Sequence, residues 1–518
     1  MTIFVRAESL DDIKDLVVEA GIGNLPSRAA AANPTAVAFR SAEGDRDLTY
    51  RELDEQVDRC AGGLRQRLGR EGVVVAVAQV LDPVFAVAYY GIARAGNVSA
   101  VINPLLHTEG MVRLLRACGA EAAILTPEMA ESLAPVRHEV PQLRDVMLTT
   151  DLPSDSAPVA AEPDWDSVAS IVFTSGTTGA PKAVPLTHRN LAVNAAQTVH
   201  AQELDSSAVM FNYFPTFHTM HLNAAVLAGA TQVLYQGPDV AGSLKVAERH
   251  GVTHYYSLPM RLAQLANEPS PAPRTVRALL SGGSALAPHT AAELARRFGV
   301  PVVQGYGLAE ASPLTHFNRF DDPRPGSCGR PVAGTECRVV DIDTREVLTA
   351  GEKGEVQIRG PQVMRGYLGQ PATEELDEEG WFTTGDVGKI DTEGYLFLVD
   401  RIRDVFKCDN FLVSPTEIEA VLRQHPAVAD CAVVDTPDEV SGATAYALVV
   451  LRDTNAQDRP TPAAIQLAVN ANLPSFMRLA HVEPVTEIPR TRHGKVLRRE
   501  IRDQLRNQLR DQLRNRRL

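Results

Sequence analysis

Strand-type and helix-type patterns of apolar residues alternate from about residue 48 to residue 300. Residues 73–77 and 232–235 are short apolar runs typical of buried strands, while residues 50–68 and 110–118 carry apolar side chains at helical spacing. Alternation of this kind favours an α/β architecture built on largely parallel sheets.

The pattern changes after about residue 326. Closely spaced strands and turns follow, among them GEVQIRG, GWFTTGD and TEGYLFLVD, and they predict an antiparallel β-rich subdomain over about 326–400. Beyond Asp400 the pattern becomes α+β, with a predicted helix over residues 414–424 and strands over residues 431–434 and 445–451. Ser414 is the predicted N-cap of that helix, with proline next and Glu417 at the capping-box position.

Length, composition and charge narrow the class of protein. A chain of 518 residues is too long to fold around one hydrophobic core, so at least two domains are expected. A content of 44% hydrophobic and 22% charged residues is typical of a soluble globular protein. The formal charge of −13 argues against a nucleic-acid partner. The six cysteines are scattered without metal-binding spacing, which indicates reduced thiols.

The chain carries no pattern typical of secretion or membrane insertion. The first sixteen residues include early acidic side chains and lack the apolar core of a signal peptide. The most apolar window, residues 73–93, is interrupted by Gln79, Asp82 and Pro83, which argues against a transmembrane segment. We therefore predict a cytoplasmic protein.

The stretch TSGTTGAPK is the first candidate for chemistry. Glycines let the backbone approach a ligand, and successive N–H groups and hydroxyls can donate to phosphate oxygens. The spacing is not that of the Walker motif, and taken by itself the stretch fits a linker as well as a phosphate cradle. Its candidate ligand-binding residues are Thr174, Ser175, Gly176, Thr177, Thr178, Gly179 and Lys182.

Three further motifs are weak one by one. In QGYGLAE, Tyr306 between two glycines can stack on a planar base and Glu310 can hold a divalent cation, but a common turn with a solvated carboxylate fits equally well. In GWFTTGD, Asp386 can accept from a ribose diol or simply occupy a β-turn. In PRTRHGK, Lys495 beside Gly494 is either a mobile cation for a site or part of an exposed basic loop.

Taken together and in this order, the four motifs resemble the adenylate-forming superfamily, which includes acyl-CoA synthetases, aryl-CoA ligases, luciferases and stand-alone adenylation domains. The resemblance extends from Leu48 to Lys495 and is closest to the acyl-CoA synthetase branch. Further matching segments are PTFH at 215–218, SGG at 281–283, GE at 354–355, and DR at 400–401 leading into SPTEIE at 414–419.

The resemblance implies a fold and a domain division. It implies an α/β protein whose N-terminal domain, residues 1–400, combines two α/β sheet subdomains with the β-rich subdomain. A small, mobile α+β domain over residues 404–518 would rotate about a hinge at residues 401–403. One orientation would present Lys495 for adenylation, and the other would present the loop at residues 407–411 for attack by a thiol.

The resemblance also implies a reaction and roles for the motif residues. Family members join a carboxylate to the α-phosphate of ATP, release pyrophosphate, and pass the acyl group to a thiol, usually that of CoA. The TSGTTGAPK loop would hold the β- and γ-phosphates, and Glu310 would bind Mg²⁺, which neutralises charge as pyrophosphate leaves. Adenine would lie against Tyr306, with neighbouring nucleotide-binding positions at Gly282, Gly283, Gly305 and Ala309.

The remaining roles concern ribose, the acid and the transferred group. Asp386 and Arg401 would hold the ribose hydroxyls, and Lys495 would bridge the substrate carboxylate and the α-phosphate, stabilising charge in the transition state. His218 would line the wall between the acyl pocket and the thiol tunnel. The expected pocket residues are Phe217, His218 and His221.

The sequence departs from the family pattern at three places. Ala309 stands where the family usually has a threonine, so a donor to the α-phosphate is missing, at a cost of about 1.5–3 kcal/mol. Asn410, beside Asp409, replaces a common glycine, and Arg403 replaces the usual Asp or Lys at the hinge. His221 replaces a usual glycine and would reshape the acyl pocket.

These observations favour an AMP-forming acid–CoA ligase that uses ATP, Mg²⁺ and CoA to activate a hydrophobic carboxylic acid. The loss at Ala309 predicts impaired adenylation, so that conversion of an acyl-adenylate to the thioester dominates. Two alternatives stay open: a stand-alone adenylation protein that loads a carrier-protein thiol, and a non-catalytic nucleotide-binding relative. A separate adenylating enzyme or a carrier protein would then be the partner.

Overall fold

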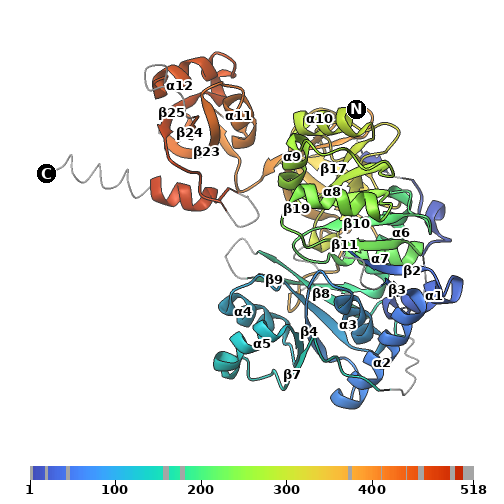
Figure 1. Ribbon diagram of the computed structural model, residues 1–518. Coiled ribbons are helices and arrows are strands. Elements are labelled where there is room, and N and C mark those ends of the chain that lie inside the picture. Colours follow the sequence, from blue (N-terminus) through green and yellow to red (C-terminus); the bar gives the residue numbers. More distant parts are fainter. Residues whose placement is uncertain are drawn as a thin grey trace.

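The computed structural model describes most of the chain. For residues 4–6 and 175 it describes the backbone alone. The described ranges are 4–6, 8–17, 21–42, 47–155, 163–175, 181–370, 376–409, 411–438, 440–452, 460–490 and 496–505. Figure 1 shows a large body, coloured blue to yellow, and a separate orange-red lobe joined to it by a narrow connection.

A six-stranded sheet, coloured blue to teal, lies in the lower part of the body in Figure 1. Its order is β7-β6-β4-β5-β8-β9, parallel except for the β8–β9 pair. The strands are β4 (Val74–Ala78), β5 (Val98–Ile102), β6 (Ala122–Leu125), β7 (Asp145–Leu148), β8 (Val168–Ser175) and β9 (Pro181–Thr187). Its helices are α2 (Tyr50–Leu68), α3 (Pro83–Arg94), α4 (Thr108–Cys118) and α5 (Pro127–Leu133).

Both faces of this sheet are buried, which explains why its strands are continuous apolar runs. Val75 and Val77 of β4 belong to the core shared with α2 and α3, while Ala76 and Ala78 belong to the core shared with α4 and α5. Figure 1 shows the two helix pairs on opposite sides of the sheet.

The body contains a second, nine-stranded sheet. Its order is β16-β15-β14-β13-β12-β10-β11-β2-β3, parallel from β14 to β2 and antiparallel at both ends. The strands are β2 (Val37–Ser41), β3 (Asp47–Thr49), β10 (Val209–Tyr213), β11 (Thr231–Leu234), β12 (His254–Ser257), β13 (Ala278–Ser281), β14 (Val302–Gly307), β15 (Leu314–Phe317) and β16 (Arg330–Pro331). The helices around it are α1 (Leu25–Ala32), α6 (His188–Ala201), α7 (Thr219–Ala228), α8 (Val240–Arg249), α9 (Pro259–Asn267) and α10 (Pro288–Phe298).

A five-stranded antiparallel sheet completes the body, as the β-rich pattern predicted. Its order is β1-β17-β18-β19-β20. The strands are β1 (Phe4–Arg6), β17 (Glu336–Val340), β18 (Gly354–Arg359), β19 (Phe382–Ile390) and β20 (Leu396–Arg401). The outer strand β1 comes from the start of the chain and pairs with β17, a long-range pairing that the sequence pattern did not predict.

The orange-red lobe has its own hydrophobic core, drawn from residues 406–505. It contains β21 (Phe406–Cys408), β22 (Phe411–Val413), α11 (Pro415–Leu422), β23 (Val428–Asp438), β24 (Gly442–Leu451), α12 (Pro462–Asn470) and β25 (Leu479–Pro484). Ser414 caps α11 as predicted, but the carboxylate of Glu417 pairs with Lys353 instead of closing a capping box. Among the described residues, no helix is long and apolar enough to cross a membrane.

Candidate active site

Two tight turns shape the candidate nucleotide site. After β14 the chain doubles back to β15, and a Cβ at Gly307 would lie 2.3 Å from the carbonyl oxygen of Pro313, so only glycine fits there. After β13, Gly283 has a φ of +84°. A Cβ built on Gly282 would meet nothing within 4 Å, which leaves open space above this backbone for a flat ligand.

Tyr306, Asp386 and Arg401 lie in one hydrogen-bonded row. The hydroxyl of Tyr306 donates to Asp386, and Arg401 Nε lies 2.7 Å from the other carboxylate oxygen. Asp386 on β19 faces Arg401 on β20 in the register of the sheet. Burial, and then the nearby Asp386 carboxylate, raise the pKa of Tyr306 well above its usual value, so the phenol stays a neutral donor. These three predicted residues are therefore brought together.

Glu310 and Lys182 approach one another through a third side chain. Glu310 lies on the short helix η4 (Ala309–Ala311), is 8% exposed, and accepts a hydrogen bond of 2.7 Å from the hydroxyl of Tyr367. Lys182 Nζ lies 4.1 Å from the centroid of the Tyr367 ring. Thr174 faces Lys182 across the β8–β9 pair. The predicted phosphate-binding residues between them, 176–180, lie outside the described residues.

The acidic groups near this site fit magnesium rather than a metal held wholly by protein ligands. In the described ranges, no group of three or more His, Cys, Asp or Glu side chains is arranged to hold a metal ion. Mg²⁺ is commonly bound by one or two carboxylates together with substrate phosphates. Glu310 offers one carboxylate, and its helix η4 contacts strands β8 and β9, which flank the predicted phosphate loop.

The predicted acyl-pocket residues lie at the start of α7, with different surroundings. Phe217 is fully buried, and the centroid of its ring lies 5.9 Å from that of Phe39 and 6.0 Å from that of Phe85. His218 caps α7, its Nδ1 accepting from the N–H of Met220 at 3.2 Å, which places the ring proton on Nε2. His218 itself is exposed to solvent.

His221 is a buried imidazole among aromatic rings. Its ring centroid lies 4.6 Å from that of Tyr256, 5.1 Å from that of Phe214 and 5.8 Å from that of His218. Burial, and then the neighbouring His218, lower its pKa well below the usual value, so the ring is neutral. Its Nδ1 is buried without a hydrogen-bond partner among the described residues. Such an atom is costly unless a ligand pairs with it.

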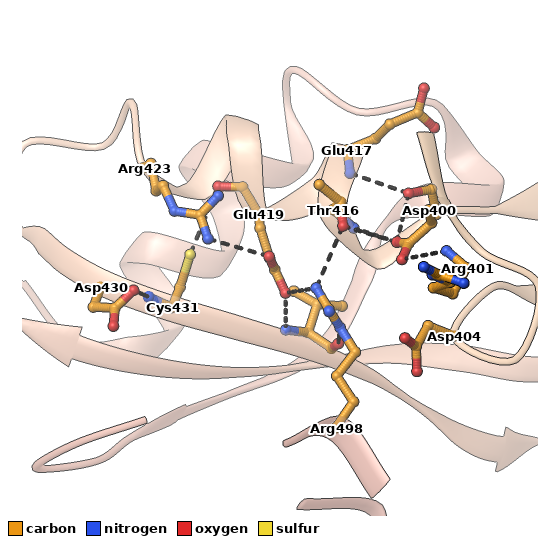
Figure 2. A network of polar contacts seen from close by, with 12 residues as sticks. Asp400, Arg401, Asp404, Thr416, Glu417, Glu419, Arg423, Asp430, Cys431 and Arg498 are labelled. Carbon is orange, nitrogen blue, oxygen red and sulfur yellow. Dashed lines mark hydrogen bonds and ion pairs between the residues drawn. The ribbon is translucent and has the colours of Figure 1, made fainter. Parts of the chain in front are cut away.

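Asp400, just before the predicted hinge, links β20 to the start of α11. Its carboxylate accepts from Ser414 Oγ at 2.9 Å and from the N–H and hydroxyl of Thr416 at 3.1 and 2.8 Å (Figure 2). Asp409 has a φ of +50°, so the backbone before Asn410 is left-handed. Asn410 itself and Lys495 lie outside the described residues.

Tyr367 is the residue near the site that the motif analysis missed. It is 8% exposed and contacts both Glu310 and Lys182. Its sequence context, MRGYLG, carries no titratable group with an obvious task, so only the tertiary contacts reveal it.

Comparison with known proteins gives matches over most of the chain. Residues 26–368 match the AMP-binding enzyme family, and residues 417–495 match the AMP-binding enzyme C-terminal domain. The chain is 32% identical over 487 residues to 4-coumarate–CoA ligase 3 of Arabidopsis thaliana, covering 88% of this chain and 86% of the relative. It is 33% identical over 495 residues to a feruloyl-CoA synthase of an Amycolatopsis species, covering 93% and 98%.

Solved structures agree with these matches. The ATP-bound MatB of Rhodopseudomonas palustris superposes with a TM-score of 0.85 at 26% identity, covering 93% of this chain and 98% of that one.

Proposed function

Because this chain belongs to the AMP-binding enzyme family and is an AMP-forming carboxylic acid–CoA ligase, we propose that it activates a compact, ring-bearing acid and that adenylation is its slower half-reaction. One observation carries the assignment of the site. A single turn, from residue 306 to residue 310, has a group of polar side chains at each end. At one end is the row Tyr306–Asp386–Arg401, and at the other is the group Glu310–Tyr367–Lys182.

The side chains of these two groups suit a nucleotide. Asp386 and Arg401 would bind the ribose hydroxyls, and the face of Tyr306 would support the base. In the first step the substrate carboxylate attacks the α-phosphorus, an acyl–phosphate bond forms, and pyrophosphate leaves. In the second step the thiol of CoA attacks the acyl carbon and AMP leaves. Mg²⁺ held by Glu310 and the phosphates would neutralise charge on the departing pyrophosphate.

Ala309 supports the slow first step. It lies next to Glu310 at the start of η4, between the nucleoside and phosphate ends of the site, and offers only a methyl group. A hydroxyl donor to a charged oxygen is worth about 1.5–3 kcal/mol, which is roughly one to two powers of ten in rate. The second step forms no new bond at the α-phosphorus, so it is less affected.

The surroundings of His221 support the choice of acid. The apolar rings of Phe214 and Tyr256 lie tilted against it, and its neutral ring offers an unpartnered nitrogen. Together they suit an acid with a ring and one hydrogen-bonding substituent. The named substrates of two relatives, 4-coumarate and ferulate, have these features. The acid is thus hydrophobic in its body and polar at one point.

A substrate panel tests the proposal. Cinnamic acids with and without ring hydroxyls, and saturated straight-chain acids of equal length, would be supplied once with MgATP and CoA and once as synthetic adenylates with CoA. We expect thioesters of the hydroxylated ring acids, formed faster from the adenylates. A preference for straight chains would refute the proposed acid. Thioester on a holo carrier protein, with none on CoA, would instead favour carrier loading.

A further inference from the structure

Tyr367 lies between the two halves of the proposed phosphate site. Its hydroxyl donates to Glu310 at 2.7 Å, while the face of its ring lies 4.1 Å from Lys182 Nζ. The side chain is 8% exposed, so these contacts are made inside the protein. One residue therefore contacts both the carboxylate proposed to bind Mg²⁺ and the cation proposed to bind phosphate.

The backbone around Tyr367 is fastened to the same two places. The N–H of Met364 donates to the carbonyl of Glu310 at 2.7 Å, and the N–H of Leu368 donates to the carbonyl of Ala183, next to Lys182, at 3.0 Å. The tyrosine is thus fixed relative to both the η4 turn and strand β9.

Helix α6 and the η4 turn hold the preceding residues of the same segment. Asn190 Nδ2 donates to the carbonyls of Pro361 and Val363 at 2.7 and 3.1 Å. Ser312 Oγ donates to the carbonyl of Gln362 at 2.9 Å. These bonds leave the segment before Tyr367 little freedom to shift, so the position of its side chain is determined by the fold.

Each contact has a consequence for a bound nucleotide. A hydroxyl that donates to one carboxylate oxygen fixes the rotamer of Glu310 and leaves its other oxygen for a cation, as outer-shell partners do for metal ligands. An ammonium over an aromatic face is attracted by the ring, so the ring helps to fix the position of Lys182. Tyr367 thus fixes the separation between the two groups.

We propose that Tyr367 is a positioning residue that holds Glu310 and Lys182 at the separation required by the phosphates and Mg²⁺ of MgATP. This inference rests on the proposed function of the site. It concerns the triphosphate and its metal, so it predicts an effect on MgATP and none on AMP or on the thioester step.

Two substitutions separate the contacts, and a second tyrosine provides a matched control. Tyr367→Phe removes only the hydroxyl, and Tyr367→Leu also removes the ring face. Tyr395 has the same kinds of contact elsewhere, a hydroxyl bonded to Asp322 at 3.0 Å and two arginines over its ring. Tyr395→Phe therefore controls for the loss of one buried tyrosine hydroxyl.

The readouts are calorimetric Kd values for MgATP and for AMP, together with the rate of thioester formation from supplied acyl-adenylate. We expect Tyr367→Phe to weaken MgATP binding about tenfold and Tyr367→Leu to weaken it further. AMP binding and thioester formation should stay within about twofold of the native protein, and Tyr395→Phe should match the native protein throughout.

Equal losses of MgATP and AMP affinity in Tyr367→Phe would assign the residue a purely structural role and overturn the inference. Unchanged MgATP binding would overturn it as well. The binding measurements do not depend on turnover. A native protein that makes no thioester would therefore contradict the proposed function without deciding the role of Tyr367.

Discussion

At position 309 the side chain is a methyl group, next to Glu310 at the start of η4. Replacing it in Ala309→Thr restores a hydroxyl that can donate to the α-phosphate. We expect acid-dependent pyrophosphate exchange to rise by about ten- to a hundredfold, with thioester formation from supplied acyl-adenylate unchanged. Initial exchange rates measured at saturating MgATP provide the check, and an exchange rate equal to that of the native protein would refute this role.

His221 is the residue at which the acid would be distinguished. The substitution His221→Phe keeps a ring against Phe214 and Tyr256 and removes the unpartnered nitrogen. We expect the preference for a ring-hydroxylated acid over its unsubstituted analogue to fall by about tenfold, the worth of one hydrogen bond. The ratio of the two kcat/KM values measures this preference with an internal control. An unchanged ratio would exclude His221 as the discriminating group.

Residues with a motif could be found from the sequence, and residues without one could not. Tyr306, Asp386 and Arg401 were named from their motifs, and they meet in one row. Tyr367 was missed because its importance comes from contacts with segments about 57 and 185 positions away along the chain. Phe217 was expected to line the acyl pocket; its ring is buried against those of Phe39 and Phe85, and its part in the pocket stays a prediction.

Among the secondary-structure elements, helix α11 depends on a buried ion pair. Glu419 is 3% exposed at its side chain and pairs with Arg498 at 2.6 Å, while also accepting from the N–H of Val433 at 2.9 Å (Figure 2). The substitution Glu419→Ala leaves Arg498 buried without this carboxylate, and we expect it to cost about 3 kcal/mol of stability in the C-terminal lobe.

A second pair on the same carboxylate gives the control. Arg423 also contacts Glu419, at 3.2 Å, but its side chain is 44% exposed. Arg423→Ala should therefore cost less than about 1 kcal/mol. Protease susceptibility and thermal unfolding of the lobe compare the two variants. Equal losses of stability in the two variants would show that the buried pair with Arg498 contributes no more than the exposed pair with Arg423.

Helices and strands that are specified by neighbouring residues in the sequence were predicted well. Those that form only by pairing with a segment far away along the chain were not. Helix α2 occupies the predicted residues because Thr49 and Glu52 form a capping box at its start and Gly69 ends it in a left-handed conformation. Strand β1 has only three residues and exists through pairing with β17, more than three hundred positions later. No local pattern can specify such a pairing.

For the whole molecule, buried histidines predict a loss of stability under mildly acidic conditions. Burial lowers the pKa of His188 and of His254 to about 4 and that of His316 to about 3, from a usual value of 6.5. Above pH 6.5 these rings are neutral in both the folded and the unfolded protein. As the pH falls below 6.5, the unfolded chain takes up protons that the folded chain does not, so stability is lost toward pH 4.

The size of the effect makes it measurable. Each such histidine removes up to about 1.4 kcal/mol of stability per pH unit. The thermal midpoint should therefore fall steadily from pH 6.5 to pH 5, before most carboxylates titrate. Replacing one ring, as in His316→Asn, should reduce the slope by about a quarter, because the buried rings of His188, His221 and His254 remain. A flat midpoint across this range would show that the buried rings do not govern acid stability.

Comparing the rates of the two half-reactions in one preparation tests most directly whether the protein is a ligase with a slow adenylation step. The acid preferred in the panel would be used to measure pyrophosphate exchange with MgATP, and its synthetic adenylate to measure CoA thioester formation. We predict that both reactions occur and that thioester formation is at least about tenfold faster than exchange. Exchange as fast as thioester formation would contradict the claim that adenylation is the slower half. Absence of thioester from either starting material would contradict the ligase itself.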